Sequence, residues 1–167
     1  ARTVYGMSAI TALTAQNTTG VQGILPVPAA FLQQQLEAVC SDLPPQAVKI
    51  GMLASADQVP VICQAIHTYA LRNIVVDPVM VATTGATLTQ QETICAMQEQ
   101  LFPLATLLTP NLVEAEALLG TAITTCSEME QAAKQLAARY HTAVLLKGGH
   151  LTEEATDILY DPETGLH

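Results

Sequence analysis

The chain has 167 residues, the length of one ordinary domain, so a two-domain organisation is disfavoured. Half of the residues are apolar and only 13% are charged, which excludes a disordered or low-complexity chain. Fifteen Asp and Glu residues outnumber six Lys and Arg residues, and the formal net charge of −9 excludes a broad basic surface for nucleic acid or an anionic membrane.

The first half of the chain alternates between strand-like and helix-like patterns. Residues 7–15 are apolar and rich in small or β-branched types, which predicts a strand followed by a polar loop. Apolar residues then recur at helical spacing after Pro28, a residue that is favoured in the first turn of a helix. Residues 47–53 predict a second strand, and Asp57 is the predicted cap of the helix that follows it.

The middle of the chain repeats this alternation. Residues 74–76 are β-branched and predict a buried strand that ends at Asp77. Thr89 and Glu92 have the spacing of a capping box, in which each side chain bonds the other residue's backbone N–H at the start of a helix. Residues 106–108 predict the next short strand.

The last third adds two helices and two strands. Asn111 is the predicted cap of one helix, and Ser127 with Glu130 has the capping-box spacing for the other. Residues 143–146 predict a further strand, and residues 157–160 predict an antiparallel strand at the edge of the sheet.

Strands that alternate with helices predict an α/β fold in three layers, with a mostly parallel open sheet flanked by helices and right-handed crossovers. The chain offers too few strands for a closed eight-stranded barrel. Neither an internal repeat nor a linker interrupts the pattern, so residues 1–167 are predicted to form a single domain.

The four cysteines form no CxxC pair and have no His at metal-ligand spacing. Cys40, Cys63 and Cys95 lie in apolar helical patterns and are predicted to be small buried hydrophobes. A chain with this much core does not depend on a disulfide framework, and no apolar run reaches about eighteen residues. These features predict a cytoplasmic protein.

Polar or glycine-containing clusters follow the predicted strands. Ligands of open parallel sheets bind beyond the carboxyl ends of the strands, so these clusters are expected to form one site. No Walker A sequence, GxGxxG motif or nucleophile elbow occurs. The clusters are Gln16-Asn17-Thr18, Gly51-Met52, Asp77-Pro78-Val79, Thr109-Pro110-Asn111 with Glu114, and Lys147-Gly148-Gly149-His150.

The charged and amide candidates each have an ordinary structural explanation beside the functional one. Asp77 is either a turn former before Pro78 or a ligand of Mg²⁺, which prefers hard oxygen ligands. Asn111 and Glu114 are either a helix-capping pair or the holders of metal-bound waters near a nucleotide phosphate. Lys147 is either solvated at a turn or placed to neutralise charge on a transferring phosphoryl group.

Five segments of the chain occur in the order and spacing of a known group of kinases. They are ITALTAQNTTGV, KIGML, VVDPVM, TPNLVEAEAL and LLKGGH. Together they resemble the hydroxymethylpyrimidine (phosphomethylpyrimidine) kinases of thiamine biosynthesis, which belong to the ribokinase-like superfamily. The resemblance implies ATP- and Mg²⁺-dependent phosphorylation of 4-amino-5-hydroxymethyl-2-methylpyrimidine, then of its monophosphate, by a homodimer.

The resemblance also implies which residues bind the pyrimidine. Gln16 would bind the aminopyrimidine through its amide, which both donates and accepts hydrogen bonds. Met52 and Val79 would supply apolar contacts to the flat ring. Without the resemblance, Gln16 is equally explained as a residue that satisfies backbone groups in the turn before Thr18.

For the cofactors, the resemblance implies that Asp77, Asn111 and Glu114 organise Mg²⁺ and its waters, with Asp77 and Glu114 as the metal residues. Lys147 would lie near the ATP phosphates and stabilise the charge of the transferred group, and Asn111 would also lie at the nucleotide.

Two parts of the family pattern do not occur in this sequence. Members carry a glycine-rich segment before the position of Ala1, and a GTGC-like loop beyond the position of His167 whose Cys is the catalytic base. The domain is therefore expected to be incomplete at both ends and inactive by itself. Two alternatives are a pyridoxal or pyridoxine kinase of the same superfamily, and a non-catalytic remnant.

Overall fold

The computed structural model describes residues 4–80, 88–149 and 156–166. The main element is a six-stranded sheet in the order β3-β4-β5-β6-β7-β8. Strands β3 to β6 are parallel to one another, β7 is antiparallel to β6, and β8 is antiparallel to β7. This confirms the predicted mostly parallel α/β fold with an antiparallel edge. The strands are β3 (Val48–Ile50), β4 (Ile74–Val76), β5 (Leu107–Leu108), β6 (Ala143–Leu146), β7 (Ile158–Asp161) and β8 (Gly165–Leu166).

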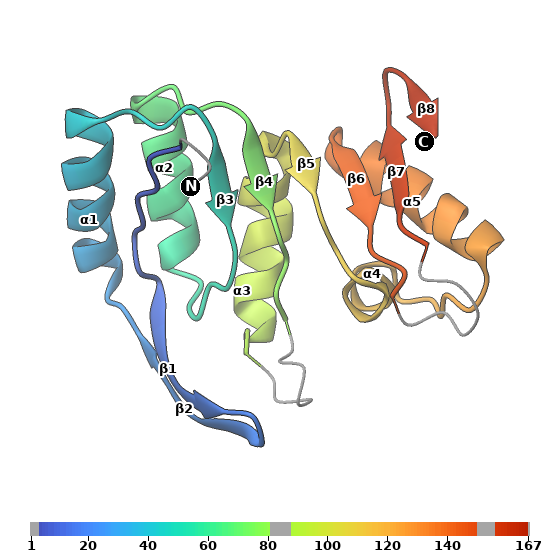
Figure 1. Cartoon of the computed structure of the whole chain (residues 1–167), viewed down its shortest axis with the longest axis horizontal. Coiled ribbons are helices and arrows are strands. Elements are labelled where there is room, and N and C mark those ends of the chain that lie inside the picture. The colour runs from blue at the N-terminus through green and yellow to red at the C-terminus, as the bar shows by residue number, and fades with distance from the viewer. Residues whose placement is uncertain (1–3, 81–87, 150–155, 167) are drawn as a thin grey trace.

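A hairpin of β1 (Ala12–Asn17) and β2 (Gly20–Pro26) stands apart from this sheet. Figure 1 shows that it projects beyond the carboxyl ends of β3 and β4. The predicted strand at residues 7–15 is wrong in its bounds, and β2 is missed. The reason is the turn: Asn17 Oδ1 accepts hydrogen bonds from the backbone N–H groups of Thr19 (2.9 Å) and Gly20 (3.1 Å), so the predicted polar loop reverses the chain at once.

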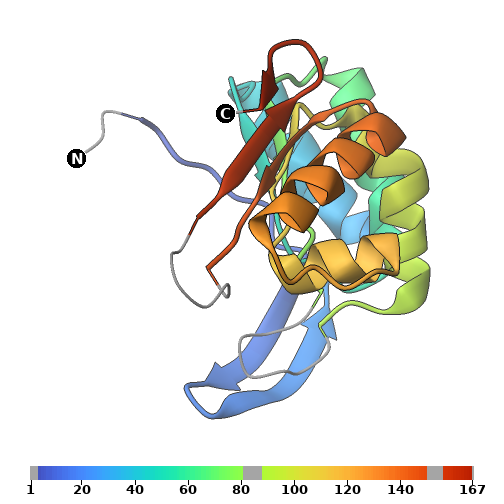
Figure 2. The same ribbon diagram turned by 90° about the vertical axis from the view of Figure 1, so that its right-hand side faces the viewer.

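Helices α2 to α5 lie on one side of the sheet (Figure 2), and α1 packs against α2. Helices therefore pack against the sheet, as the predicted α/β fold requires. Helix α3 continues into a π-helical turn and then a 3₁₀ turn before β5. The helices are α1 (Ala29–Asp42), α2 (Gln58–Thr68), α3 (Gln91–Ala96), α4 (Leu112–Leu119) and α5 (Cys126–Tyr140).

Helix boundaries match the prediction where one local signal dominates. Helix α4 begins after Asn111 as predicted and ends at Gly120, whose left-handed backbone (φ 72°) costs glycine little. Helix α5 is capped by Thr125, so the predicted capping pair of Ser127 and Glu130 is wrong. The segment around this start offers the same capping-box spacing in two registers, and local pattern alone does not choose between them.

Two further predicted caps are not formed. Helix α3 begins after Gln90, and the buried hydroxyl of Thr89 instead lies 2.8 Å from the carbonyl oxygen of Val79 and 3.1 Å from that of Leu53. Asp57 occupies the cap position of α2 but makes no side-chain capping bond. Tertiary contacts, which the sequence pattern does not reveal, take the Thr89 hydroxyl away from the helix.

All four cysteines are free. Cys40 and Cys63 are buried as predicted, and burial raises the pKa of both thiols. Cys95 is exposed, so its predicted burial is wrong, and Cys126 is exposed as well.

The register of the parallel strands divides their side chains between two faces of the sheet. One face is buried in the hydrophobic core with residues of the helices. On the other face Lys49 pairs with Val75, and Leu107 pairs with Ala143. Because side chains alternate along a strand, Asp77 lies on this second face together with Lys49. The core residues of the first face are Ile50, Ile74, Val76, Leu108, Val144 and Leu146.

Candidate active site

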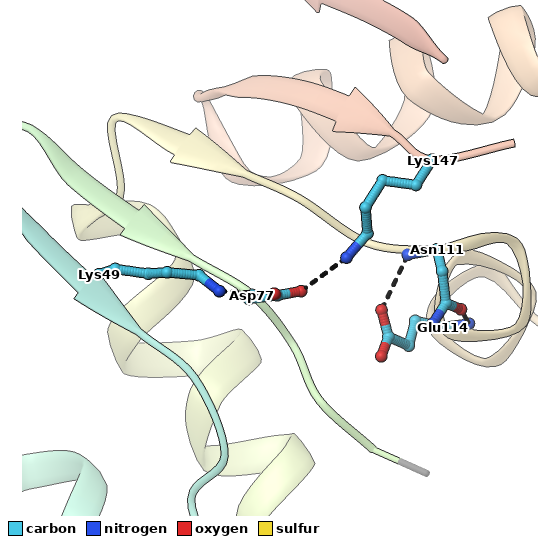
Figure 3. Close-up of polar contacts among 5 residues, drawn as sticks. All are labelled: Lys49, Asp77, Asn111, Glu114 and Lys147. Atoms are coloured by element: carbon cyan, nitrogen blue, oxygen red, sulfur yellow. Dashed lines mark hydrogen bonds and ion pairs between the residues drawn. The ribbon is translucent and has the colours of Figure 1, made fainter. Parts of the chain in front are cut away.

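Four of the predicted site residues gather at the carboxyl ends of β4, β5 and β6 (Figure 3). Asp77 directly follows β4, Asn111 caps α4 after β5, and Lys147 directly follows β6. The backbone N–H of Lys147 donates to the carbonyl oxygen of Pro110 (2.9 Å), which holds the two strand ends together. The structure therefore brings Asp77, Asn111, Glu114 and Lys147 to the carboxyl edge of the sheet, where ligands of open parallel sheets bind.

Asp77 lies between two lysines (Figure 3). Lys147 Nζ is 2.9 Å from Asp77 Oδ1, and Lys49 Nζ is 3.0 Å from Asp77 Oδ2. The sequence analysis missed Lys49, because it lies inside β3 and not beyond its end. Its signal is the strand pairing: Lys49 is opposite Val75, so it is a diagonal neighbour of Asp77 on the same face. We call Lys49, Asp77, Asn111, Glu114 and Lys147 the edge cluster.

The two lysines keep Asp77 ionised. Burial raises the pKa of this carboxyl, but the hydrogen bonds and charges of Lys147 and Lys49 outweigh burial and leave the pKa below its ordinary value. The Asp77 side chain is 16% exposed, whereas that of Lys147 is 37% exposed. Asp77 can therefore hold the Lys147 ammonium in place while that ammonium stays accessible to an anionic ligand.

Asn111 and Glu114 form a complete capping box at the start of α4. Asn111 Oδ1 accepts from the backbone N–H of Glu114 (2.9 Å), and Glu114 Oε2 accepts from the backbone N–H of Asn111 (2.8 Å). Only 4% of Glu114 is exposed. Burial raises the pKa of Glu114 and the charge of Asp77 adds to the rise, against the backbone N–H of Asn111 and the charge of Lys147. Glu114 is thus coupled electrostatically to both members of the ion pair.

Close packing requires a glycine directly after Lys147. A Cβ atom at Gly148 would collide with the carbonyl oxygen of Thr156 and with the side chain of Met129. The Gly148 N–H also donates to Asp157 Oδ1 (3.0 Å). These contacts fix the turn from which the Lys147 side chain extends. His150, which borders the site in the sequence, lies outside the described residues.

The three residues predicted to bind substrate lie on separate segments near this edge. Gln16 is exposed on β1, next to the irregularity in the hairpin pairing. Met52 follows β3, and its carbonyl oxygen accepts from the hydroxyl of Thr11 (2.7 Å). Val79 follows β4, and its N–H donates to the carbonyl oxygen of Asp77 (2.8 Å). The structure places Met52 and Val79 at neighbouring strand ends and Gln16 on the projecting hairpin.

Asp77 and Glu114 provide the oxygen ligands that Mg²⁺ prefers. Within residues 4–80, 88–149 and 156–166, no group of three or more His, Cys, Asp or Glu side chains could hold a metal ion. Mg²⁺ is usually bound through only one or two carboxylates, with phosphate oxygens and water completing its shell. Carboxylate oxygens that already accept one N–H keep a further lone pair. The two carboxylates therefore fit a magnesium ion of this kind.

Taken together, these features define a class of protein. The carboxyl edge of an open, mostly parallel sheet is where α/β proteins bind small ligands. An accessible, fixed ammonium beside two carboxylates suits a phosphorylated ligand and its counter-cation. The sequence model of one family, phosphomethylpyrimidine kinase, matches residues 1–167. The chain belongs to the phosphomethylpyrimidine kinase family, whose members transfer phosphoryl groups.

Named relatives agree with this assignment. The chain is 44% identical over 160 residues to the hydroxymethylpyrimidine/phosphomethylpyrimidine kinase of Bacillus subtilis (strain 168), an alignment that covers 95% of this chain and 59% of the relative. It is 50% identical over 158 residues to the thiamine biosynthesis bifunctional protein ThiED of Geobacter sulfurreducens, covering 94% of this chain and 32% of that protein. The chain therefore spans about three fifths of the length of the Bacillus subtilis relative.

Solved structures show the same fold. The phosphomethylpyrimidine kinase of Clostridium difficile 630 superposes with a TM-score of 0.89 at 39% identity, covering 99% of this chain and 71% of that one. The pyridoxal kinase of Staphylococcus aureus in complex with AMP-PCP and pyridoxal superposes with a TM-score of 0.83 at 31% identity, covering 96% and 58%. In the part of this chain that the structure describes, no helix has the length and apolar character needed to cross a membrane.

Proposed function

We propose that the whole protein phosphorylates 4-amino-5-hydroxymethyl-2-methylpyrimidine, and then its monophosphate, for thiamine biosynthesis. Family membership and the names of the Bacillus subtilis and Geobacter sulfurreducens relatives support this substrate. The observation that carries the proposal is the edge cluster, in which the Lys147–Asp77 ion pair lies beside the buried capping box of α4. We further propose that the protein is a cytoplasmic homodimer with one kinase domain.

We propose ATP as the phosphoryl donor. The structurally similar pyridoxal kinase of Staphylococcus aureus, solved in complex with AMP-PCP, supports this choice. Lys147 binds the nucleotide phosphates and stabilises negative charge on the transferred group, because its ammonium is accessible and Asp77 fixes its position. Asn111 lies at the same phosphates. Bound Mg²⁺ would supply further charge neutralisation, and Asp77 and Glu114 are the residues that would hold it and its waters.

The substrate ring is proposed to lie between the hairpin and the strand ends. Gln16 pairs its carboxamide with the exocyclic amino group and the neighbouring ring nitrogen of the pyrimidine, whereas pyridoxal offers a phenolic oxygen and an aldehyde there. Met52 and Val79 contact the faces of the ring. This arrangement favours the aminopyrimidine over pyridoxal.

The experiment is a substrate comparison with the whole purified protein. We expect ATP-dependent formation of the monophosphate and the diphosphate of hydroxymethylpyrimidine, which mass spectrometry can detect. We expect kcat/KM for pyridoxal to be lower than kcat/KM for hydroxymethylpyrimidine. Gln16→Ala should lower kcat/KM for the pyrimidine by about 5- to 150-fold, the cost of leaving a polar group of the bound pyrimidine unpaired, and should affect pyridoxal less. Higher kcat/KM for pyridoxal in the wild-type protein would instead make it a pyridoxal kinase.

A further inference from the structure

One buried polar side chain outside the edge cluster contacts three separate segments. Gln58, the first residue of α2, is 0% exposed. Its Nε2 donates to the carbonyl oxygens of Thr11 (2.7 Å) and Val27 (2.8 Å), and its Oε1 accepts from the backbone N–H of Ala54 (3.2 Å). A carboxamide has two N–H donors, and both are used here. Both the donor and the acceptor ends of this buried carboxamide are therefore hydrogen-bonded to the backbone.

Two of these partners are the ends of the β1–β2 hairpin. Thr11 directly precedes β1, and Val27 directly follows β2. The Val27 N–H also donates to the carbonyl oxygen of Thr11 (2.9 Å), so the two legs are joined to each other where Gln58 joins both to α2. Figure 1 shows the rest of the hairpin projecting away from this point. The direction of the hairpin is thus set at its base.

The third partner belongs to the segment that carries Met52. Ala54 lies two residues after Met52, between β3 and α2. The Thr11 hydroxyl donates to the Met52 carbonyl oxygen (2.7 Å), so this segment is bonded to the hairpin base from a second side. A displacement of the hairpin base would therefore change the position of Gln16, on the hairpin, relative to Met52.

We propose that Gln58 is a positioning residue for the pyrimidine site, because its buried carboxamide fixes the hairpin that carries Gln16 against the segment that carries Met52. This inference rests on the proposed function of Gln16 and Met52. Gln58 does not touch the substrate in this account. Its effect is on substrate affinity, and Asp77, Asn111, Glu114 and Lys147, which lie at the ends of β4, β5 and β6, keep their geometry.

The test is Gln58→Met in the whole protein, because methionine keeps the volume of glutamine and removes its hydrogen bonds. We expect KM for hydroxymethylpyrimidine to rise by about 5- to 30-fold, because part of the cost of the three lost hydrogen bonds appears as weaker substrate binding. We expect kcat to change less than about twofold and KM for ATP to stay unchanged, because the phosphate-binding residues are not displaced. Backbone amides of β1 and β2 should exchange hydrogen faster, and those of α5 should not.

Two control variants separate positioning from general stability. Gln35→Met removes the pair of hydrogen bonds between Gln35 and the backbone of Ile10 (2.9 and 3.0 Å), one residue from Thr11, without touching the second leg of the hairpin. Thr142→Val removes the hydrogen bond from the Thr142 hydroxyl to the Ala105 carbonyl oxygen (2.7 Å), just before the starts of β5 and β6. Both should leave KM for the pyrimidine unchanged.

A double-mutant cycle gives the decisive result. If Gln58 acts through Gln16, the loss caused by Gln16→Ala should be smaller in the Gln58→Met background than in the wild-type protein. Additive losses, or a Gln58→Met variant that lowers the melting temperature with an unchanged KM, would overturn the proposal. If the wild-type protein does not phosphorylate the pyrimidine at all, the proposed function fails, and unchanged hydrogen exchange in β1 and β2 of Gln58→Met would then overturn the positioning role separately.

Discussion

The same capping motif occurs at the starts of α4 and α5, in very different surroundings. In both helices the cap side chain accepts from the third residue's backbone, and the glutamate at that position accepts in return. Glu114 of α4 is 4% exposed, and burial raises its pKa. Glu128 of α5 is exposed, and hydrogen bonds from Thr124 and Thr125 lower its pKa. The motif alone therefore indicates a helix start and does not indicate a site.

Position in the fold makes the difference between the two capping boxes. Helix α4 directly follows β5, so its start lies among the strand ends with Asp77 and Lys147, whereas α5 follows another helix. A functional assignment for an N-x-x-E segment therefore depends on the neighbours that the sheet brings to it. Changes at each box, and at the charges beside it, can test this dependence.

The largest effect is expected from removing the cation beside the α4 box. Lys147→Met should lower kcat by about 100- to 1000-fold, as does the loss of other preorganised groups that stabilise charge in a transition state. Lys134→Met is the matched control on α5, where Lys134 only approaches Glu130 at 4.0 Å on the surface. Steady-state kinetics should show no change for the control. Similar kcat values for both variants would contradict a role of Lys147 in phosphoryl transfer.

An intermediate effect is expected from removing each cap. Asn111→Ala and Thr125→Ala should each lower the free energy of unfolding by about 1 kcal/mol, which chemical denaturation measures. The Asn111 variant should also lose activity, because Glu114 loses its partner within the edge cluster. The Thr125 variant should keep full activity once folded. Equal activity in the two variants would mean that both caps are structural only.

The smallest effect is a pH dependence at the exposed box. A carboxyl group whose pKa is lower in the folded state stabilises the fold above its unfolded pKa, and this contribution is lost as the pH falls through the folded value. The stability difference between wild type and Glu128→Gln should therefore shrink as the pH is lowered from about 5 to about 3. Urea unfolding at several pH values measures it.

The control for that titration is Glu130→Gln, two residues along α5. Glu130 belongs to the predicted capping register, and its ion pair with Lys134 is exposed. We expect no comparable pH-dependent difference for this variant. A larger difference for Glu130→Gln than for Glu128→Gln would favour the sequence-based register over the observed one.

Much of the fold and of the edge cluster could be predicted from the sequence, because strong signals are local. Continuous apolar runs at 74–76 and 143–146 gave strands in those places, and the residues after them, Asp77 and Lys147, fall where parallel strands end. Asn111 and Gly120 bound α4 as expected.

What the sequence analysis missed depends on contacts between distant segments. Lys49 joins the edge cluster only through the pairing of β3 with β4, and Thr89 does not cap its helix because its hydroxyl bonds two carbonyl oxygens from other segments. Gln58 offers no local signal, since its partners lie on the hairpin and on the β3–α2 segment. Such roles follow from tertiary structure, which a pattern along one chain does not contain.

We expect the α4 capping box to serve catalysis, whereas the α5 box serves only the helix. Glutamine can replace glutamate in a capping box, so Glu114→Gln and Glu128→Gln should both keep their helices. The two variants then differ only in the effect of losing a carboxylate charge at each position. With saturating ATP, Mg²⁺ and pyrimidine, we predict that Glu114→Gln lowers kcat of the whole protein by roughly 30- to 1000-fold, equivalent to about 2–4 kcal/mol. Glu128→Gln should leave kcat unchanged. An unchanged kcat in both variants would contradict the account and reduce Glu114 to a helix cap.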